Sequence, residues 1–137
     1  MIVVIDASVA VKWFIQEPDR AAARQLLEPG KRLIAPELLV AEVASALWKR
    51  AMAGESDVRQ APLTAASLPR FFARLVSLAP LATRSLEIAA ELRHPVYDCF
   101  YLALAESEDT VVVTADRRLI GRLAGSRWDG LCRPLAG

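Results

Sequence analysis

The chain has 137 residues, of which 54% are hydrophobic and 24% are charged, a composition typical of one globular domain with a substantial core. This composition argues against disorder, and a chain of this length needs no disulfide or structural zinc to fold. The formal net charge is +1, so any phosphate-binding surface has to be local. We expect one domain over residues 1–137.

Cysteine, histidine and hydropathy exclude further classes of site. Cys99 and Cys132 form no CxxC pattern and His94 is the single histidine, which argues against zinc sites and Cys/His nucleophiles. No apolar stretch reaches the roughly 18 residues of a membrane span, and no basic region followed by a long apolar run opens the chain. We therefore expect a cytoplasmic protein that makes no contact with membranes.

Strand and helix signals alternate along the chain. The apolar, β-branched run at residues 2–6 predicts a strand buried on both faces, and residues 110–114 form a second such run. Weaker strand signals fall at residues 32–35, 78–81 and 131–134. Helical patterns fall at residues 7–15, 18–27, 36–53, 64–76, 83–92, 97–106 and 116–123, with a polar loop at 54–63. This alternation predicts an α/β fold with parallel strands and helices on both faces of the sheet.

The two buried runs each end in an aspartate, Asp6 and Asp116. Ligand sites in open α/β sheets form beyond the carboxyl ends of the strands, so both carboxylates could meet in one cleft. Ser8 and Thr114 each lie two residues away and could orient the carboxylates through their hydroxyls. The alternative for all of these residues is local capping of the following helix.

Two further acids lie on predicted helices. Asp98 shares a face with apolar residues, so its carboxylate needs a partner or a cation unless it interacts with the helix N-terminus. Glu42 forms a narrow polar stripe with Ser45 and Lys49 on a helix that is otherwise largely apolar, and the stripe faces either solvent or a cleft.

Carboxylates that converge repel one another, by roughly 4 kcal/mol for one pair at ~4 Å and an effective dielectric constant near 20. Either they take up protons or a divalent cation neutralises them. Oxygen ligands without Cys or His favour Mg²⁺ or Mn²⁺, and the sequence leaves one ion or two open. Such an ion can lower the pKa of bound water and stabilise charge on a phosphodiester.

Four segments resemble the motifs of PIN-domain proteins, in the same order and over nearly the whole chain. They are IVVIDASVAVKWF at residues 2–14, PELLVAEVASAL at 36–47, YDCFYLALA at 97–105 and TADRRL at 114–119. By position, Asp6 and Asp98 match the family's main metal ligands, Asp116 its third aspartate and Glu42 its acid for metal or water positioning. Ser8 and Thr114 match supporting polar positions, although many relatives have asparagine where this chain has Ser8.

A chain of this size most resembles VapC-type toxins of type II toxin–antitoxin pairs. The resemblance implies a three-layer α/β/α fold around a mainly parallel sheet of four to five strands. It also implies a homodimeric ribonuclease that cuts RNA and is inhibited by a cognate VapB-type antitoxin. In the mechanism we expect, Asp6, Asp98 and Asp116 hold the metal, Glu42 helps to activate a water, and cleavage leaves a 5′ phosphate. Candidates for phosphate contacts are Lys12, Arg117, Arg118 and Arg122, each of which could equally be solvated helix surface.

Other interpretations remain open at this point. An aspartyl-phosphate enzyme also places acids at strand ends, but it would have a second acid where Ser8 stands. A non-catalytic PIN-like module for RNA binding or assembly is the alternative from a different class, and the presence of all four acids speaks against it. The aromatic residues Trp13, Phe14 and Trp48 fit core packing better than a dimer or antitoxin surface.

Overall fold

Five strands pair in one sheet of order β3-β2-β1-β4-β5, and every pairing is parallel. The structure is a computed structural model and describes residues 1–136. The strands are β1 (Ile2–Ile5), β2 (Arg32–Pro36), β3 (Arg74–Val76), β4 (Val112–Thr114) and β5 (Cys132–Pro134). The helices are α1 (Ala7–Ala10), η1 (Val11–Trp13), α2 (Arg20–Gln25), α3 (Leu38–Met52), α4 (Ala61–Ser67), η2 (Leu68–Phe71), α5 (Ala79–Leu92), α6 (Val96–Ser107) and α7 (Arg117–Leu123), where η marks 3₁₀ helices.

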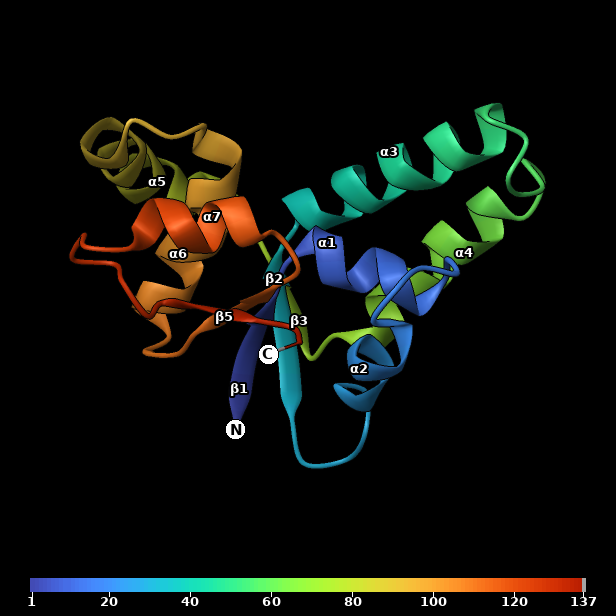
Figure 1. Cartoon of the computed structure of the whole chain (residues 1–137), viewed down its shortest axis with the longest axis horizontal. Helices are drawn as coiled ribbons and strands as arrows, with labels where there is room; N and C mark the ends of the chain where they lie inside the picture. Colours follow the sequence, from blue (N-terminus) through green and yellow to red (C-terminus); the bar gives the residue numbers. More distant parts are fainter. Residues whose placement is uncertain (137) are drawn as a thin grey trace.

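The helices form two layers, one on each side of the sheet (Figure 1). The chain moves from β1 through β2 to β3 in one direction, with α1 to α4 in these connections. It then returns past β1 to β4 and β5, with α5, α6 and α7 in the return connections. Because parallel crossovers are right-handed, the reversal of direction places the second set of helices on the other face. The predicted three-layer α/β/α fold is confirmed, with five strands.

The core forms where the central strand β1 is covered on both faces. Val4 and Ile5 are fully buried, as expected for a β-branched strand without alternation. Helix α6 packs against β1, β2 and β4, and most of its residues from Cys99 to Ala105 are buried. Among residues 1–136, no helix is both long and apolar enough to cross a bilayer.

The third strand lies where the sequence pattern predicted a helix. The helix expected at residues 64–76 ends as α4 at Ser67, continues as the 3₁₀ turn η2, and gives way to β3. Pro69 has no amide hydrogen and cannot continue an α-helix, and Ala73 then donates to the carbonyl of Leu33 in β2 at 2.8 Å. The strand expected at residues 78–81 is wrong because α5 begins at Ala79, with a proline in its first turn. The expected loop 54–63 ends early for the same reason, since Pro62 lies in the first turn of α4.

Helices α3 and α4 extend together beyond the sheet (Figure 1). Trp48 on α3 is 58% exposed, so core packing was the wrong interpretation for this residue, whereas Trp13 is buried as expected at 3%. Trp13 packs against the rings of Phe14, Phe71 and Phe72. The other large apolar side chains exposed on this pair of helices and their connection are Met52, Val58 and Leu63.

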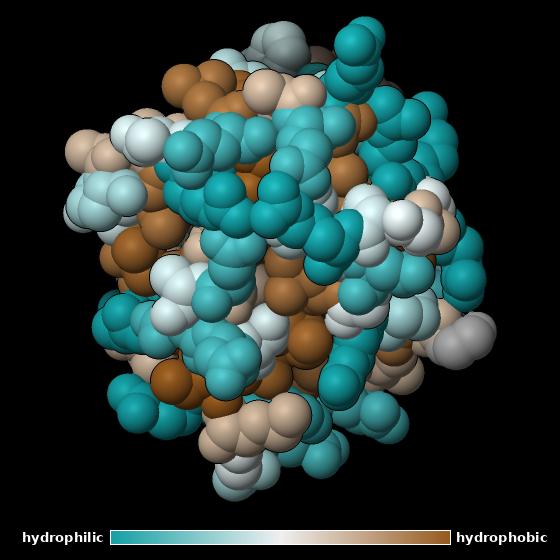
Figure 2. Space-filling model, turned by 90° about the vertical axis from the view of Figure 1, so that its left-hand side faces the viewer, coloured by the Kyte–Doolittle hydropathy of each residue, from teal (hydrophilic) through white to brown (hydrophobic). Residues whose placement is uncertain are grey.

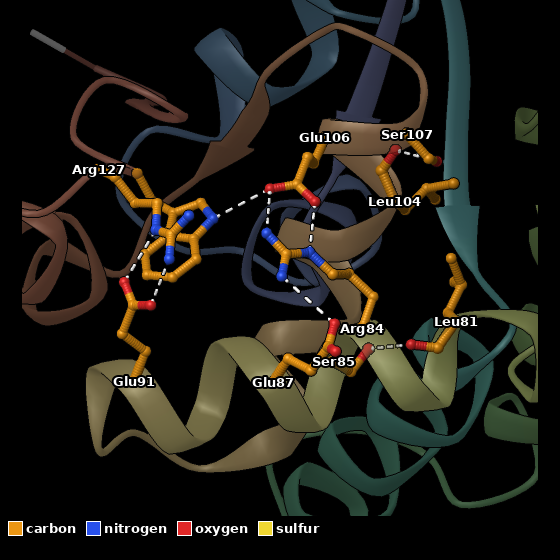
Figure 3. A network of polar contacts seen from close by, with 10 residues as sticks. Leu81, Arg84, Ser85, Glu87, Glu91, Leu104, Glu106, Ser107 and Arg127 are labelled. Atoms are coloured by element: carbon orange, nitrogen blue, oxygen red, sulfur yellow. Dashed lines mark hydrogen bonds and ion pairs between the residues drawn. The ribbon is translucent and has the colours of Figure 1, made fainter.

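The opposite helical layer carries a network of ion pairs (Figure 3). Arg84 on α5 donates to Glu106 on α6 at 2.6 Å, and Arg127 pairs with Glu91. Trp128 is buried, donates to Glu106 at 3.2 Å and lies beneath the guanidinium groups of Arg84 and Arg127. These contacts fasten the chain that follows α7 to α5 and α6. The surface on this side of the molecule mixes hydrophilic and hydrophobic residues (Figure 2).

Candidate active site

The site begins at the carboxyl ends of β1 and β4, which are neighbours in the sheet. The chain leaves β1 toward β2 on one side and later returns to β4 on the other side, so the strand order reverses between these two strands. Such a reversal separates the following loops and opens a crevice at the strand ends, where ligands of open α/β sheets bind. Asp6 follows β1 and its amide donates to the carbonyl of Val113 at 3.1 Å, which brings it beside Thr114 at the end of β4.

Two hydroxyl groups hold the Asp6 carboxylate. Thr114 Oγ1 donates to Asp6 Oδ2 at 2.9 Å, and Ser8 Oγ donates to the same oxygen. Each hydroxyl also accepts an amide from the chain after β4, Ser8 from Ala115 and Thr114 from Asp116, both at 3.0 Å. The side chain of Asp6 is therefore positioned by a network that joins the two strand ends.

Asp6 and Asp116 have similar places in the sequence but different contacts. The carboxylate of Asp116 accepts from the amides of Arg118 at 2.9 Å and Leu119 at 3.2 Å, so it caps α7. Asp6 precedes α1 and its side chain makes no such capping hydrogen bond. The capping alternative therefore describes Asp116 and does not describe Asp6, which is only 7% exposed and faces the network of hydroxyls.

Glu42 reaches the site from the middle of α3. Its carboxylate accepts a hydrogen bond from the hydroxyl of Tyr101 on α6 at 2.6 Å. Glu42 is half-buried, whereas Ser45 and Lys49 on the same stripe of α3 are exposed. The polar stripe thus runs from solvent into the space between α3 and α6, and Glu42 lies at the inner end.

Asp98 lies in the first turn of α6, where the helix dipole favours a negative charge. Its Oδ2 lies 2.7 Å from Nε2 of His94, which precedes Asp98 by four residues and lies before the start of α6. The carboxylate therefore has a side-chain partner.

The acids of the site influence one another's electrostatic surroundings, as the pKa values of Asp6 and Glu42 show. Burial raises the pKa of Asp6, the hydroxyls of Ser8 and Thr114 oppose this, and the charge of Asp98 raises it further. Burial also raises the pKa of Glu42, against the hydrogen bond from Tyr101, and the charges of Asp6 and Asp98 add to the rise. The neighbouring carboxylates thus come close enough to disfavour the ionisation of Asp6 and Glu42.

Asp116 and the acids of this cluster act on the same side chain, that of Cys132, the first residue of β5. Burial raises the pKa of the Cys132 thiol to about 12, and the charges of Asp6, Asp98 and Asp116 contribute to the rise. Asp116 is in addition one hydrogen bond away from Thr114, which contacts Asp6. The structure therefore brings all four predicted acids to one end of the sheet, with Asp116 at the margin.

The chemistry of this donor set fits a hard divalent cation. Its ligands would be carboxylate oxygens, and none of the described lysines or arginines is among the groups that act on the pKa of Asp6 or Glu42. Within residues 1–136, no three acidic, histidine or cysteine side chains stand close enough together to hold a metal as they are placed. The side chains would have to move toward a bound ion.

Three of the four basic candidates make other side-chain contacts, and the fourth is exposed. Lys12 donates to the carbonyl of Pro18 at 3.0 Å, and Arg122 donates to the carbonyls of Leu92 and Arg93 at the end of α5. Arg117 donates to the carbonyl of Ala136 at 2.9 Å, and Arg118 is exposed. Their role in binding phosphate stays a prediction.

Sequence reasoning did not assign Tyr101 and His94 to the site. A local signal existed for Tyr101, because it follows Asp98 by three positions, which is the spacing of neighbours on a helix surface. His94 lies before α6, so helical spacing did not indicate its contact with Asp98. The partner of Tyr101 could not be inferred, since Glu42 lies 59 positions away in the chain.

Comparisons with known proteins identify the family of the chain. The family model of the PIN domain matches residues 3–125. Ribonuclease VapC3 of Pyrobaculum aerophilum is 31% identical over 121 residues, which cover 87% of this chain and 92% of the relative. Ribonuclease VapC9 of Mycobacterium tuberculosis is 36% identical over 120 residues, which cover 85% of this chain and 87% of the relative.

Solved structures share the fold. A crystal structure of a Pyrobaculum aerophilum protein, PAE2754, matches with a TM-score of 0.72 and 25% identity and covers 97% of this chain and 88% of that one. VapBC2 from Rickettsia felis, bound to a DNA fragment from its promoter, matches with a TM-score of 0.70 and covers 98% of both chains, but at 14% identity it supports the fold alone. By its family model and by relatives above 30% identity over most of their length, the chain belongs to the PIN-domain family and to its VapC branch.

Proposed function

We propose that this PIN domain, comprising residues 1–137, is a Mg²⁺- or Mn²⁺-dependent endoribonuclease and the toxin of a VapBC-type pair. The observation that carries the proposal is the cluster of Asp6, Glu42 and Asp98 at the point where the strand order reverses. Asp6 is buried, Glu42 is half-buried, and the charge of Asp98 contributes to the raised pKa of both. The names of the relatives, ribonucleases of the VapC type, support the same reaction.

Asp6 and Asp98 would hold the ion, and Glu42 and Asp116 would complete its surroundings directly or through water. A bound divalent ion supplies a positive charge that lowers the pKa of water and stabilises the charge developing on the phosphate. The hydroxyls of Ser8 and Thr114 hold Asp6 in place. Because both hydroxyls donate to Oδ2, they fix the direction in which the rest of this carboxylate points.

In the proposed reaction, Glu42 acts on the attacking water. Its raised pKa brings it nearer to the working pH, which suits a group that accepts a proton during the reaction. Glu42 takes a proton as the water oxygen bonds to phosphorus in line with the 3′ oxygen. The bond from phosphorus to the 3′ oxygen breaks, that oxygen takes a proton from solvent, and the other product keeps a 5′ phosphate.

A groove suggests where an RNA strand lies. It has a volume of about 510 Å³, and its lining residues are Val11 of η1, Ile15, Glu17, Ala46, Lys49 and Arg50 of α3, Ala53 and Glu55. Ala46 and Lys49 lie on the same face of α3 as Glu42, at spacings of four and seven positions. Lys49 is roughly 10 Å from Glu42 along the axis at 1.5 Å per residue, so it could contact a phosphate next to the one attacked. Lys12, Arg117, Arg118 and Arg122 remain further candidates.

The exposed apolar residues of α3, α4 and their connection support the proposal of protein partners. Trp48, Met52, Val58 and Leu63 are more than half exposed, and large exposed apolar groups mark interaction sites. A VapB-type antitoxin and a second copy of the chain are the partners we propose.

The test is to incubate RNA with the wild-type protein and Mg²⁺ or Mn²⁺ and to map the ends of the products, beside an Asp98→Ala variant. We expect new 5′ phosphate ends that are absent with the variant and after addition of a chelator. A folded wild-type protein that neither cuts RNA nor binds Mn²⁺ in calorimetry would favour a non-catalytic module. A covalent phosphoenzyme would instead favour an aspartyl-phosphate mechanism.

A further inference from the structure

Tyr101 has the largest fully buried side chain among residues 1–136, and its hydroxyl oxygen is the one polar atom of that side chain. A phenol enclosed in a core loses its contact with water and needs a hydrogen-bond partner. That partner is Oε1 of Glu42 at 2.6 Å, a distance typical of a strong bond from a hydroxyl to a carboxylate. The hydroxyl of Tyr101 thus donates its hydrogen bond to an acid of the proposed site.

The hydrogen bond connects the two helices that carry the site. Asp98 and Tyr101 stand three positions apart on α6, a spacing that puts neighbouring side chains on one helix surface. One helix therefore presents Asp98 itself and holds Glu42 of α3 through Tyr101. Helix α6 is packed against three strands of the sheet, so its side chains offer a rigid reference for α3.

The bond also distinguishes the two oxygens of Glu42. Oε1 is engaged by Tyr101, which leaves Oε2 as the oxygen able to face an ion or a water. Because Tyr101 is fully buried, its hydroxyl has no contact with water and the carboxylate of Glu42 is the partner to which it donates.

We propose that Tyr101 is a positioning residue that orients Glu42 through this hydrogen bond and thereby sets the affinity of the site for a divalent cation. The inference rests on the proposed function. The contrasting role is packing alone, in which the ring fills the core and the hydroxyl is merely accommodated. Phenylalanine at this position would then serve equally well.

The experiment compares Tyr101→Phe with Tyr97→Phe, the same chemical change at an exposed position of the same helix. Mn²⁺ affinity is measured by calorimetry on the full chain, RNA cleavage is measured separately, and thermal unfolding confirms that the variants are folded. We expect Tyr101→Phe to weaken Mn²⁺ binding by about tenfold, the range typical of groups that orient a metal ligand, and Tyr97→Phe to bind Mn²⁺ like the wild type.

A second background separates positioning from packing. If Tyr101 acts through Glu42, then Tyr101→Phe should change Mn²⁺ affinity less than about twofold when Glu42→Gln is already present, because the two groups act as one unit. An equal loss in both backgrounds would overturn the inference and favour packing. Unchanged Mn²⁺ binding in folded Tyr101→Phe would overturn it as well. If the wild type itself neither bound Mn²⁺ nor cut RNA, the proposed function would fail, and the inference with it.

Discussion

The two ends of α6 hold carboxylates in opposite electrostatic settings. At the first turn, Asp98 joins Asp6 and Glu42, and the pKa values of Asp6 and Glu42 are raised by burial and by like charges. Near the last turn, Glu106 accepts from Arg84, and hydrogen bonding to that guanidinium lowers the pKa of Glu106. Only about 12 Å of helix separate the two settings, at 1.5 Å per residue over eight residues.

The difference indicates which cluster serves stability and which serves a ligand. The cluster around Glu106 is satisfied by the protein's own arginines and by Trp128, so it needs nothing from outside. The cluster around Asp6 keeps negative charges together that the fold itself penalises. A strained arrangement of this kind is typical of functional sites, where the missing interaction comes from a ligand. In the function proposed above, a divalent cation supplies this missing interaction.

The largest expected effect that tests the contrast between the clusters around Asp6 and Glu106 is the loss of RNA cleavage in the variant Asp6→Asn. We expect cleavage of RNA to fall by more than about 100-fold, because changes in residues that merely support a metal ligand already cost 10–100-fold. The metal-free variant should be more stable than the wild type at neutral pH, because burial raises the pKa of Asp6 and thus disfavours its charged form in the folded state. Cleavage assays and thermal unfolding with chelator present measure the two effects.

Glu91→Gln is the matched control for Asp6→Asn. Hydrogen bonding to Arg127 lowers the pKa of Glu91, so the carboxylate favours the folded state and its loss should not stabilise the protein. Cleavage should stay at the wild-type rate. The contrast would break if Asp6→Asn cut RNA normally or if both variants changed stability in the same direction.

The second prediction concerns metal and pH together. Mn²⁺ should raise the midpoint temperature of thermal unfolding. At a free Mn²⁺ concentration of about 100 times the dissociation constant, binding adds about 2.7 kcal/mol to the free energy of unfolding. Since Asp6 and Glu42 have raised pKa values, protons compete with the ion, and the shift should shrink as the pH falls from 7.5 to 5.5.

In the presence of a chelator, the sign of this pH dependence reverses. The raised pKa values of Asp6 and Glu42 mean that their contribution to stability is complete below their unfolded pKa values and is lost as the pH rises through the folded ones. The double variant Asp6→Asn/Glu42→Gln should lose both the pH-dependent stabilisation by Mn²⁺ and the opposite pH dependence of stability in chelator. An equal Mn²⁺ shift in this variant would mean that the ion binds elsewhere.

The strands next to the site could be predicted because their signals are local. The β-branched runs that became β1 and β4 are legible in any short window, and so are the aspartates that end them. Strand β3 has only three residues and forms by pairing with β2, so its identity depends on a contact made after folding. The helical pattern of the residues before β3 was stronger than its short strand signal, so the sequence predicted a helix through residue 76.

The site could be predicted residue by residue but not contact by contact. Asp6 and Asp116 look alike in the sequence, each following a strand and preceding a helix. Only the structure separates the capping role of Asp116 from the enclosed carboxylate of Asp6, because the hydroxyls that hold Asp6 come from both strand ends. The bond between Tyr101 and Glu42 joins two helices and left no trace within either segment.

The smallest predicted effect concerns the other end of α6. Glu106→Gln removes the charge that Arg84 faces but leaves an oxygen able to accept from Trp128. Because the ion pair is partly exposed and screened by solvent, the midpoint of thermal unfolding should fall by no more than a few degrees at pH 7. The lowered pKa of Glu106 means that its contribution exists above its unfolded pKa and disappears as the pH falls through the folded one, so wild type and variant should converge in acid. A difference that grew toward low pH, or any loss of RNA cleavage, would show that the two ends of the helix are not the independent settings described above.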